Sequence, residues 1–411
     1  MTTPWTAAPP LGSDAYAVFR RRAIFECCKW DPQVEDTATL APFPMVIESK
    51  TWRELASLAE SLARETLAAE SELAARPELH TELGVPARCR RALRQRGTAT
   101  PGVARLIRFD FHHTRHGWRI SEANTDVPGG LNEASGVSSL MAEQYDDLAP
   151  VGDVAGAYAQ SLLDASTSGS VALVHATAYT DDHQVMAYLA RRIGALGGRA
   201  VLVSPAQLRW FAGRASVADA NEAVEVVGRF YPAEWMADLP GACSWERFFR
   251  GGTTPVSNPA AALLTQSKRL PLVWDRLRTP MPTWRALLPE TRHPHDVPAR
   301  ELEEWVLKPA LGRVGDGVGI QGVTPPREWR RIVRAARFFP RSWIAQRRFE
   351  VTPLETDAGS AHPCIGVYTV DGHAAGAYGR IASKPLVDWR ARDVSVLVRR
   401  EVRRPLSRRS A

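Results

Sequence analysis

Apolar residues recur at intervals of three and four between residues 51 and 76, separated by glutamates and arginines. They are Trp52, Leu55, Leu58, Leu62, Leu67 and Leu73. This spacing places the side chains on one face of a long amphipathic helix. Pro77 ends that helix, and residues 87–96 predict a short second one. We therefore expect residues 1–100 to form a helical N-terminal segment.

From residue 171 onward the pattern changes to short apolar runs separated by a helical stretch. The predicted order is a strand at 171–175, a helix at 181–196, a strand at 200–203 and a strand at 224–227. A strand, a helix and a second strand in this order form a βαβ unit, whose two strands are parallel. Glycine and proline at 251–255 indicate a domain edge.

The C-terminal third mixes helical and extended patterns. It predicts a helix at 259–270, strands at 305–308 and 318–323, and a hairpin over 365–381. Asp371 and Gly372 supply the two-residue turn of that hairpin, because both tolerate a positive φ. Together the segments predict an α+β fold, and the sequence contains no internal repeat.

Residues 107–124 alternate between apolar and polar positions on both sides of Gly117, which predicts a β-hairpin. A three-residue loop over 115–117 would pair Thr114 with Trp118. The alternate positions Ile107, Phe109 and Phe111 then share one face of the hairpin and can be buried.

The same register places Asp110 opposite Glu122 and Arg108 opposite Asn124 on the polar face. Two facing carboxylates repel each other unless a cation lies between them or one of them is protonated. The oxygen ligands of Asp110, Glu122 and Asn124 suit magnesium. The alternative is an acidic surface hairpin whose register is shifted by one residue.

Three histidines, His112, His113 and His116, lie near the predicted turn. We interpret them as solvated loop residues rather than zinc ligands, because no cysteine or fourth ligand follows at a suitable spacing. The five cysteines show no C-x-x-C spacing, so we expect reduced thiols.

The chain has 47 arginines and five lysines, which makes each retained lysine informative. A lysine supplies a compact charge where the planar arginine fork does not fit. Lys268 lies in an apolar stretch, and surface snorkelling is the alternative interpretation for it. Lys308 ends a predicted strand.

A glycine-rich loop, which includes Gly312, Gly315 and Gly317, follows Lys308. Its backbone N–H groups could close over phosphate oxygens while the lysine supplies positive charge. The spacing matches neither a Walker A loop nor a Rossmann fingerprint. An ordinary glycine-rich turn is therefore the alternative.

The composition, 45% hydrophobic and 24% charged, is that of a globular protein. Much of the net charge of +7 comes from arginines near the C-terminus: Arg399, Arg400, Arg403, Arg404, Arg408 and Arg409. A basic tail without stacking aromatics does not favour nucleic acid as a partner. With no long apolar run and no signal-peptide pattern, we expect a cytoplasmic protein with no membrane partner.

Arg108-x-Asp110, followed by Glu122-x-Asn124, resembles a motif of the circularly permuted ATP-grasp enzymes of the glutathionylspermidine synthase family. The resemblance extends from about residue 100 to the end of the chain. It implies that Asp110, Glu122 and Asn124 bind magnesium and that Arg108 contacts the transferred phosphate. It further implies nucleotide or phosphate contacts for Lys268, Lys308, Gln346 and Arg380.

The resemblance also implies a division of the chain. Residues 101–150 would be the metal-binding hairpin of the ATP-grasp fold, and residues 151–256 an α/β pre-ATP-grasp-like domain. Residues 257–411 would be the ATP-binding lobes with a basic tail.

The implied reaction is ATP-dependent ligation of a carboxylate to an amine through an acyl phosphate, with ADP and phosphate released. The substrates would be small molecules such as an amino acid, a peptide or a polyamine. Where bifunctional members of the family have a serine-rich stretch that contacts glutathione, this chain has Thr125 to Gly130, so glutathione is not expected. A phosphotransferase and a nucleotide-binding pseudoenzyme are the alternatives.

Overall fold

The computed structural model describes residues 3–31, 33–34, 37–95, 104–218, 222–312, 315 and 317–400. These residues form a mixed α+β fold, as the sequence predicts. The helices are α1 (Ser13–Cys27), α2 (Ser49–Ala74), α3 (Ala87–Arg94), α4 (Ser138–Ala142), α5 (Val154–Asp164), α6 (Thr180–Ala195), α7 (Ala233–Met236), α8 (Arg247–Arg250), α9 (Leu263–Gln266), α10 (Pro282–Leu287) and α11 (Pro326–Phe338).

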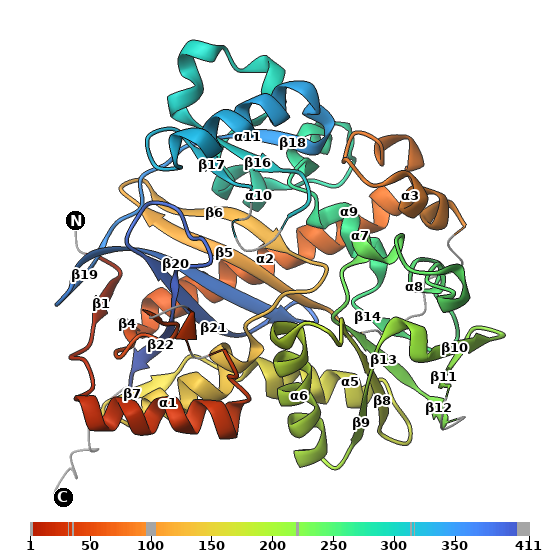
Figure 1. Cartoon of the computed structure of the whole chain (residues 1–411), viewed down its shortest axis with the longest axis horizontal. Helices are drawn as coiled ribbons and strands as arrows, with labels where there is room; N and C mark the ends of the chain where they lie inside the picture. The colour runs from red at the N-terminus through yellow and green to blue at the C-terminus, as the bar shows by residue number, and fades with distance from the viewer. Residues whose placement is uncertain are drawn as a thin grey trace, which may run out of the picture.

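The described residues build a nine-stranded main sheet in the order β1-β4-β22-β21-β20-β5-β6, with β19 paired to β20 and β7 to β22. Its strands are β1 (Trp5–Ala7), β4 (Met45–Ile47), β5 (Leu106–Thr114), β6 (Gly117–Asn124), β7 (Leu148–Pro150), β19 (Leu354–Thr356), β20 (Gly359–Val370), β21 (His373–Ala382) and β22 (Arg392–Arg399). Strands from both ends of the chain therefore lie side by side in this sheet (Figure 1). The prediction that residues 1–100 are helical is wrong in this respect, because β1 and β4 belong to the sheet.

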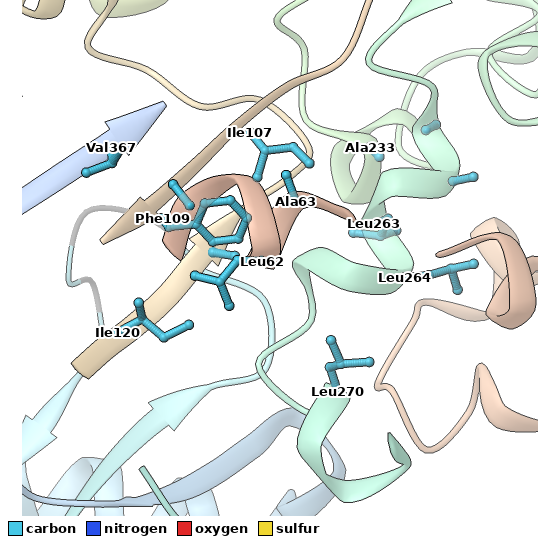
Figure 2. Close-up of a cluster of buried hydrophobic side chains, with 14 of the residues drawn as sticks. Leu62, Ala63, Ile107, Phe109, Ile120, Ala233, Leu263, Leu264, Leu270 and Val367 are labelled. Carbon is cyan, nitrogen blue, oxygen red and sulfur yellow. The ribbon is translucent and has the colours of Figure 1, made fainter. Parts of the chain in front are cut away.

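Helix α2 covers one face of the main sheet, packing on β20 and β21. The predicted amphipathic face is confirmed, since Leu55, Leu62 and Leu73 are fully buried. Figure 2 shows Leu62 beside Phe109, whose ring is also fully buried. Each such side chain contributes roughly 2 kcal/mol through burial of apolar surface. This layer fixes the apolar face of β5 and thereby turns the polar face of that strand the other way.

The opposite face of the sheet is covered by α1, α5 and the π-helical turn Glu133–Val137. Their apolar side chains share a second core with Tyr368 of β20 and Leu397 of β22. The polar face of the β5–β6 hairpin belongs to this side. Apolar layers therefore cover both faces of the sheet, except at the polar face of the β5–β6 hairpin, where charged residues take the place of an apolar core.

The hairpin has the predicted pairing of Asp110 with Glu122 and of Arg108 with Asn124. The predicted turn is wrong, because Thr114 pairs with Gly117 instead of Trp118. A register shift between Asp110 and Phe111 compensates for the shorter loop. A β-bulge of this kind adds one residue to one strand and so restores the alternation beyond it.

The predicted βαβ unit is confirmed: β8 (Ser170–Val174) and β9 (Arg199–Val203) are parallel and α6 connects them. The third strand is β13 (Val226–Arg229), two residues later than predicted, and β14 (Val256–Ser257) completes the order β14-β13-β8-β9. A small sheet beside it contains β10 (Leu208–Phe211), β11 (Arg214–Val217) and β12 (Glu222–Val224). Strands β2 (Gln33–Val34) and β3 (Thr37–Ala38) pair with each other.

A second four-stranded sheet has the order β15-β18-β16-β17 and lies beside α11 at the top of Figure 1. Its strands are β15 (Thr291–Arg292), β16 (Trp305–Pro309), β17 (Gly319–Ile320) and β18 (Trp343–Arg347). The predicted strand at 318–323 is reduced to β17. The helix predicted at 259–270 is broken, since only 260–266 is helical, before a separate turn at 270–272.

The C-terminal hairpin turns at the predicted residues, Asp371 and Gly372, with φ of 51° and 87°. Positive φ at both positions gives the twist that two-residue hairpins need. Arg399 and Arg400 do not belong to a basic tail, because β22 includes Arg399, which pairs with Asp147, and Arg400 donates to the Leu148 carbonyl. The remaining tail arginines lie outside the described residues.

Candidate functional site

A cavity of about 600 Å³ joins parts of the chain that are far apart in sequence. A cavity of this size accommodates a nucleotide or another small molecule. Ten of the sequence-predicted site residues line it: Arg108, Asp110, Glu122, Asn124, Lys268, Lys308, Gly312, Gly315, Gln346 and Arg380. Gly317 is not among the described residues that line it.

Arg108 and Asp110 form the inner part of this site. The Arg108 guanidinium donates to both Asp110 oxygens, with Nε to Oδ1 at 2.7 Å and Nη2 to Oδ2 at 3.0 Å. Asn124 Nδ2 donates to Asp110 Oδ2 at 3.3 Å. Burial raises the pKa of Asp110, although Arg108 opposes that shift. The predicted metal ligands Asp110 and Asn124 are thus in direct contact.

Two lysines bring positive charge to Glu122. Lys268 Nζ lies 3.0 Å from Glu122 Oε2. Although burial opposes it, the charges of Lys268 and Lys308 lower the pKa of Glu122 to about 2. Lys308 donates to Gln346 Oε1 at 2.7 Å and to the Ser121 carbonyl at 3.1 Å. Burial lowers the pKa of Lys308 to about 8, and Glu122 opposes that shift.

The glycine loop lies beside these lysines. Lys268 Nζ donates to the Gly312 carbonyl at 3.3 Å, which ties the loop to the site. Gly315 has a φ of 69°, and a Cβ there would collide with the Val387 carbonyl oxygen. The close approach and the positive φ both require glycine at this position. Residues 313, 314 and 316 lie outside the described part of the chain.

Arg380 projects into the cavity from β21. Its Nη2 donates to the Asp388 carbonyl at 2.7 Å, and its Nε lies 3.8 Å from Asp393 Oδ1. Arg108 and Arg380 come from different strands of the main sheet and meet at the same cavity.

The prediction that His112 is a solvated loop residue is wrong. His112 is buried in β5, contacts Ser121 Oγ at 3.0 Å and lines the cavity. Burial, with Lys308 nearby, lowers the pKa of His112 to about 4, so the ring is neutral at pH 7. His116 is exposed, as predicted. In the described ranges, no three His, Cys, Asp or Glu side chains are placed to hold a metal ion. All five cysteines are buried free thiols, as expected.

The acidic far end of the cavity is absent from the sequence-based prediction. It contains the buried Lys29 together with six carboxylate residues: Asp31, Glu133, Asp181, Asp182, Glu234 and Asp393. These residues come from five segments without a shared motif, so spacing could not reveal them. The one available signal is Lys29, because the chain keeps so few lysines.

Comparison with models of known protein families assigns the chain to one of them. The model of the glutathionylspermidine synthase pre-ATP-grasp family matches residues 42–399. The chain belongs to this family. Members of the glutathionylspermidine synthase family are ATP-dependent ligases, so membership indicates a ligase of that type.

Solved structures support the fold. A glutathione synthetase-like effector from Globodera pallida, in its apo form, is 11% identical and has a TM-score of 0.66. The similarity covers 93% of this chain and 96% of the effector chain. A search of curated proteins found no match to this chain. Within the described residues, no helix combines the length and apolar character that would be needed to cross a bilayer.

Proposed function

We propose that this member of the family is an ATP-grasp ligase that joins a carboxylate to an amine through an acyl phosphate. The observation that carries the proposal is convergence: two carboxylates, an amide, two lysines and two arginines from separate segments line one cavity. Residues 101–150 and 257–411 would form a circularly permuted ATP-grasp fold. Residues 151–256 would be its pre-ATP-grasp-like domain.

The residues around Asp110 fit a magnesium ion. The carboxylate oxygens of Asp110 and Glu122 and the amide oxygen of Asn124 would form the oxygen ligand set that this hard cation prefers. Asp110 pairs with Arg108 and Glu122 pairs with Lys268, so each of the two carboxylates already has a cation beside it. Bound magnesium would offset negative charge on the phosphates of ATP.

The nucleotide would lie along the lysine side of the cavity. Lys268 and Lys308 would meet the phosphates, and Gln346 holds the Lys308 ammonium in place through its 2.7 Å hydrogen bond. The backbone of the loop that contains Gly312, Gly315 and Gly317 would supply N–H donors to the phosphate oxygens.

The chemistry would need positioning and charge rather than a protein nucleophile. An oxygen of the substrate carboxylate attacks the γ-phosphorus of ATP, the bond to the β,γ-bridging oxygen breaks, and ADP leaves. The amine then attacks the carbonyl carbon of the acyl phosphate, loses a proton and displaces phosphate. Arg108 and Arg380 stabilise the transferred phosphoryl group and then the oxyanion.

A screen of ADP release against pools of amino acids, small peptides and polyamines tests this proposal. We expect release to require one carboxylate and to rise severalfold when its amine partner is added. ADP release that no acid or amine changes would contradict ligation, and it would indicate a phosphotransferase or an idle ATPase instead.

Nucleotide binding should depend on pH through Lys308. Phosphate binding favours the ammonium form, and the pKa of Lys308 in the free protein is about 8. Above that pH the lysine loses its proton, so the Kd for ATP should rise by up to about tenfold per pH unit. Calorimetric titration between pH 7 and 9.5 measures this. The Lys308→Met variant should bind weakly with a flat profile, and an equally steep profile in that variant would contradict the assignment.

A further inference from the structure

Lys29 is a buried lysine in the cavity that the proposed chemistry does not use. It comes just after Cys28, the residue that caps the C-terminus of α1, whose φ of 54° turns the chain so that Lys29 can enter the cavity. Its side chain is only 4% exposed. Lys29 lies outside the span that the family model matches, residues 42–399.

Three carboxylates surround the Lys29 ammonium. Its Nζ lies 2.5 Å from Glu133 Oε1, 3.1 Å from Asp31 Oδ1 and 3.1 Å from Asp393 Oδ2. The ammonium donates hydrogen bonds to Glu133 and Asp393, and Asp31 adds a third opposite charge beside it. Lys29 is therefore engaged by the protein's own carboxylates.

The carboxylates around Lys29 exceed its charge. One ammonium faces three carboxylates, and a second cation, Arg380, lies 3.8 Å from Asp393 Oδ1. Glu133 is 7% exposed, lines the cavity, and its Oε2 has no hydrogen-bond partner among the residues that the structure describes. A buried carboxylate oxygen without a partner is costly, and it marks a place for a donor.

We propose that Lys29 is a specificity-determining residue that fills an ammonium site at the acidic far end of the substrate cavity. The carboxylates of Asp31, Glu133 and Asp393 form the ammonium site, and the protein's own lysine occupies it. A cationic substrate is then held only by the outer carboxylates, such as Asp181. The cavity consequently accepts a substrate with one ammonium group there and gains little from a second.

This inference rests on the proposed function only in taking the cavity as the substrate site, and its test uses neither ATP nor turnover. Lys29→Ala removes three carbons and the ammonium, the atoms of propylammonium. We expect the variant to melt several degrees below the native protein and propylammonium to restore most of the loss. Tetramethylammonium, which has no N–H donor, should restore nothing. Lys50→Ala, at an exposed lysine, should match the native protein throughout.

A second experiment tests specificity by measuring, with calorimetry, the affinities of propylammonium and of the diammonium form of 1,4-diaminobutane. In the native protein we expect both to bind with similar affinity. In Lys29→Ala the diammonium should bind at least about tenfold more tightly than the monoammonium, because its second group reaches the vacated site. An equal preference in both proteins would overturn the proposal, as would a Lys29→Ala variant that propylammonium does not stabilise.

Loss of Lys29 also leaves three carboxylates without their cation, and because Glu133 is buried and Asp393 largely so, this is destabilising. A second variant, Lys29→Ala with Glu133→Gln, removes one of these charges and keeps two carboxylates in the site. If the single variant does not fold, the affinities of the two ammonium compounds are compared in this double variant instead. The same preference for the diammonium is expected in it, and its absence would overturn the proposal.

Discussion

Replacing Asp110 by asparagine should lower ATP-dependent turnover by about a thousandfold, which corresponds to about 4 kcal/mol of lost transition-state stabilisation. Asparagine keeps the size of the side chain but removes one of the two facing carboxylates. The Arg108 guanidinium, which forms an ion pair with Asp110 in the native protein, would lose that negatively charged partner. Both the proposed magnesium site and the orientation of Arg108 would therefore be lost. Initial rates of ADP release measure the effect.

The control for this variant is Asp146→Asn, at an exposed aspartate away from the cavity lining. It should turn over at the native rate. Melting temperatures of both variants separate loss of chemistry from loss of fold. A well-folded Asp110→Asn variant that releases ADP at the native rate would rule out the role proposed for this carboxylate.

Asp126→Asn should destabilise the protein by roughly 3–5 kcal/mol, because it leaves a buried arginine charge uncompensated. Asp126 and Arg229 form an ion pair whose side chains are 2% and 0% exposed. Asp126 also accepts a hydrogen bond from the Ala233 backbone at 2.9 Å, and Arg229 donates to the Asn258 carbonyl at 2.8 Å. This network fastens the end of the β5–β6 hairpin to strand β13. Chemical denaturation followed by circular dichroism gives the free energy of unfolding.

A matched control breaks an exposed pair of the same type. Asp147 and Arg399 lie 2.9 Å apart with side chains 65% and 53% exposed. Asp147→Asn should cost less than about 1 kcal/mol, as surface ion pairs do. Equal effects of the two substitutions would show that burial of the Asp126 pair does not govern its contribution.

The contacts of Thr125 and Asp126 show what the segment after Asn124 does in this protein. Thr125 and Asp126 are buried. Their polar groups are taken up by contacts within the chain: Gln266 accepts from the Thr125 backbone and Arg229 donates to Asp126. This segment contributes to the cavity wall while holding two parts of the fold together.

The polar face of the hairpin could be predicted because alternation alone decides which side chains face the same way. Asp110 and Glu122 are paired as expected even though the predicted loop was one residue too long. The reason is that the bulge next to Asp110 absorbs the difference. Hydrophobic alternation constrains the ends of the strands more strongly than turn chemistry constrains the loop.

The distant partners of the hairpin could not be derived from local pattern. Nothing in the periodicity around Lys308 indicates that its ammonium reaches the Ser121 carbonyl. The burial of His112 could not be predicted for a similar reason, because its ring packs against Phe349, a residue more than two hundred positions away along the chain. Lys29 and its three carboxylates are the extreme case, since three segments far apart in the chain meet there. Such contacts depend on tertiary packing, which a single sequence reveals only through family resemblance.

The most direct test of the account is to trap the acyl phosphate with hydroxylamine in place of the amine. The protein is incubated with ATP, magnesium and each acid that stimulates ADP release, and the hydroxamate is quantified by mass spectrometry. We expect one hydroxamate per ADP for the true acid, and loss of both products in Asp110→Asn. ADP release without hydroxamate from every stimulating acid would contradict ligation through an acyl phosphate.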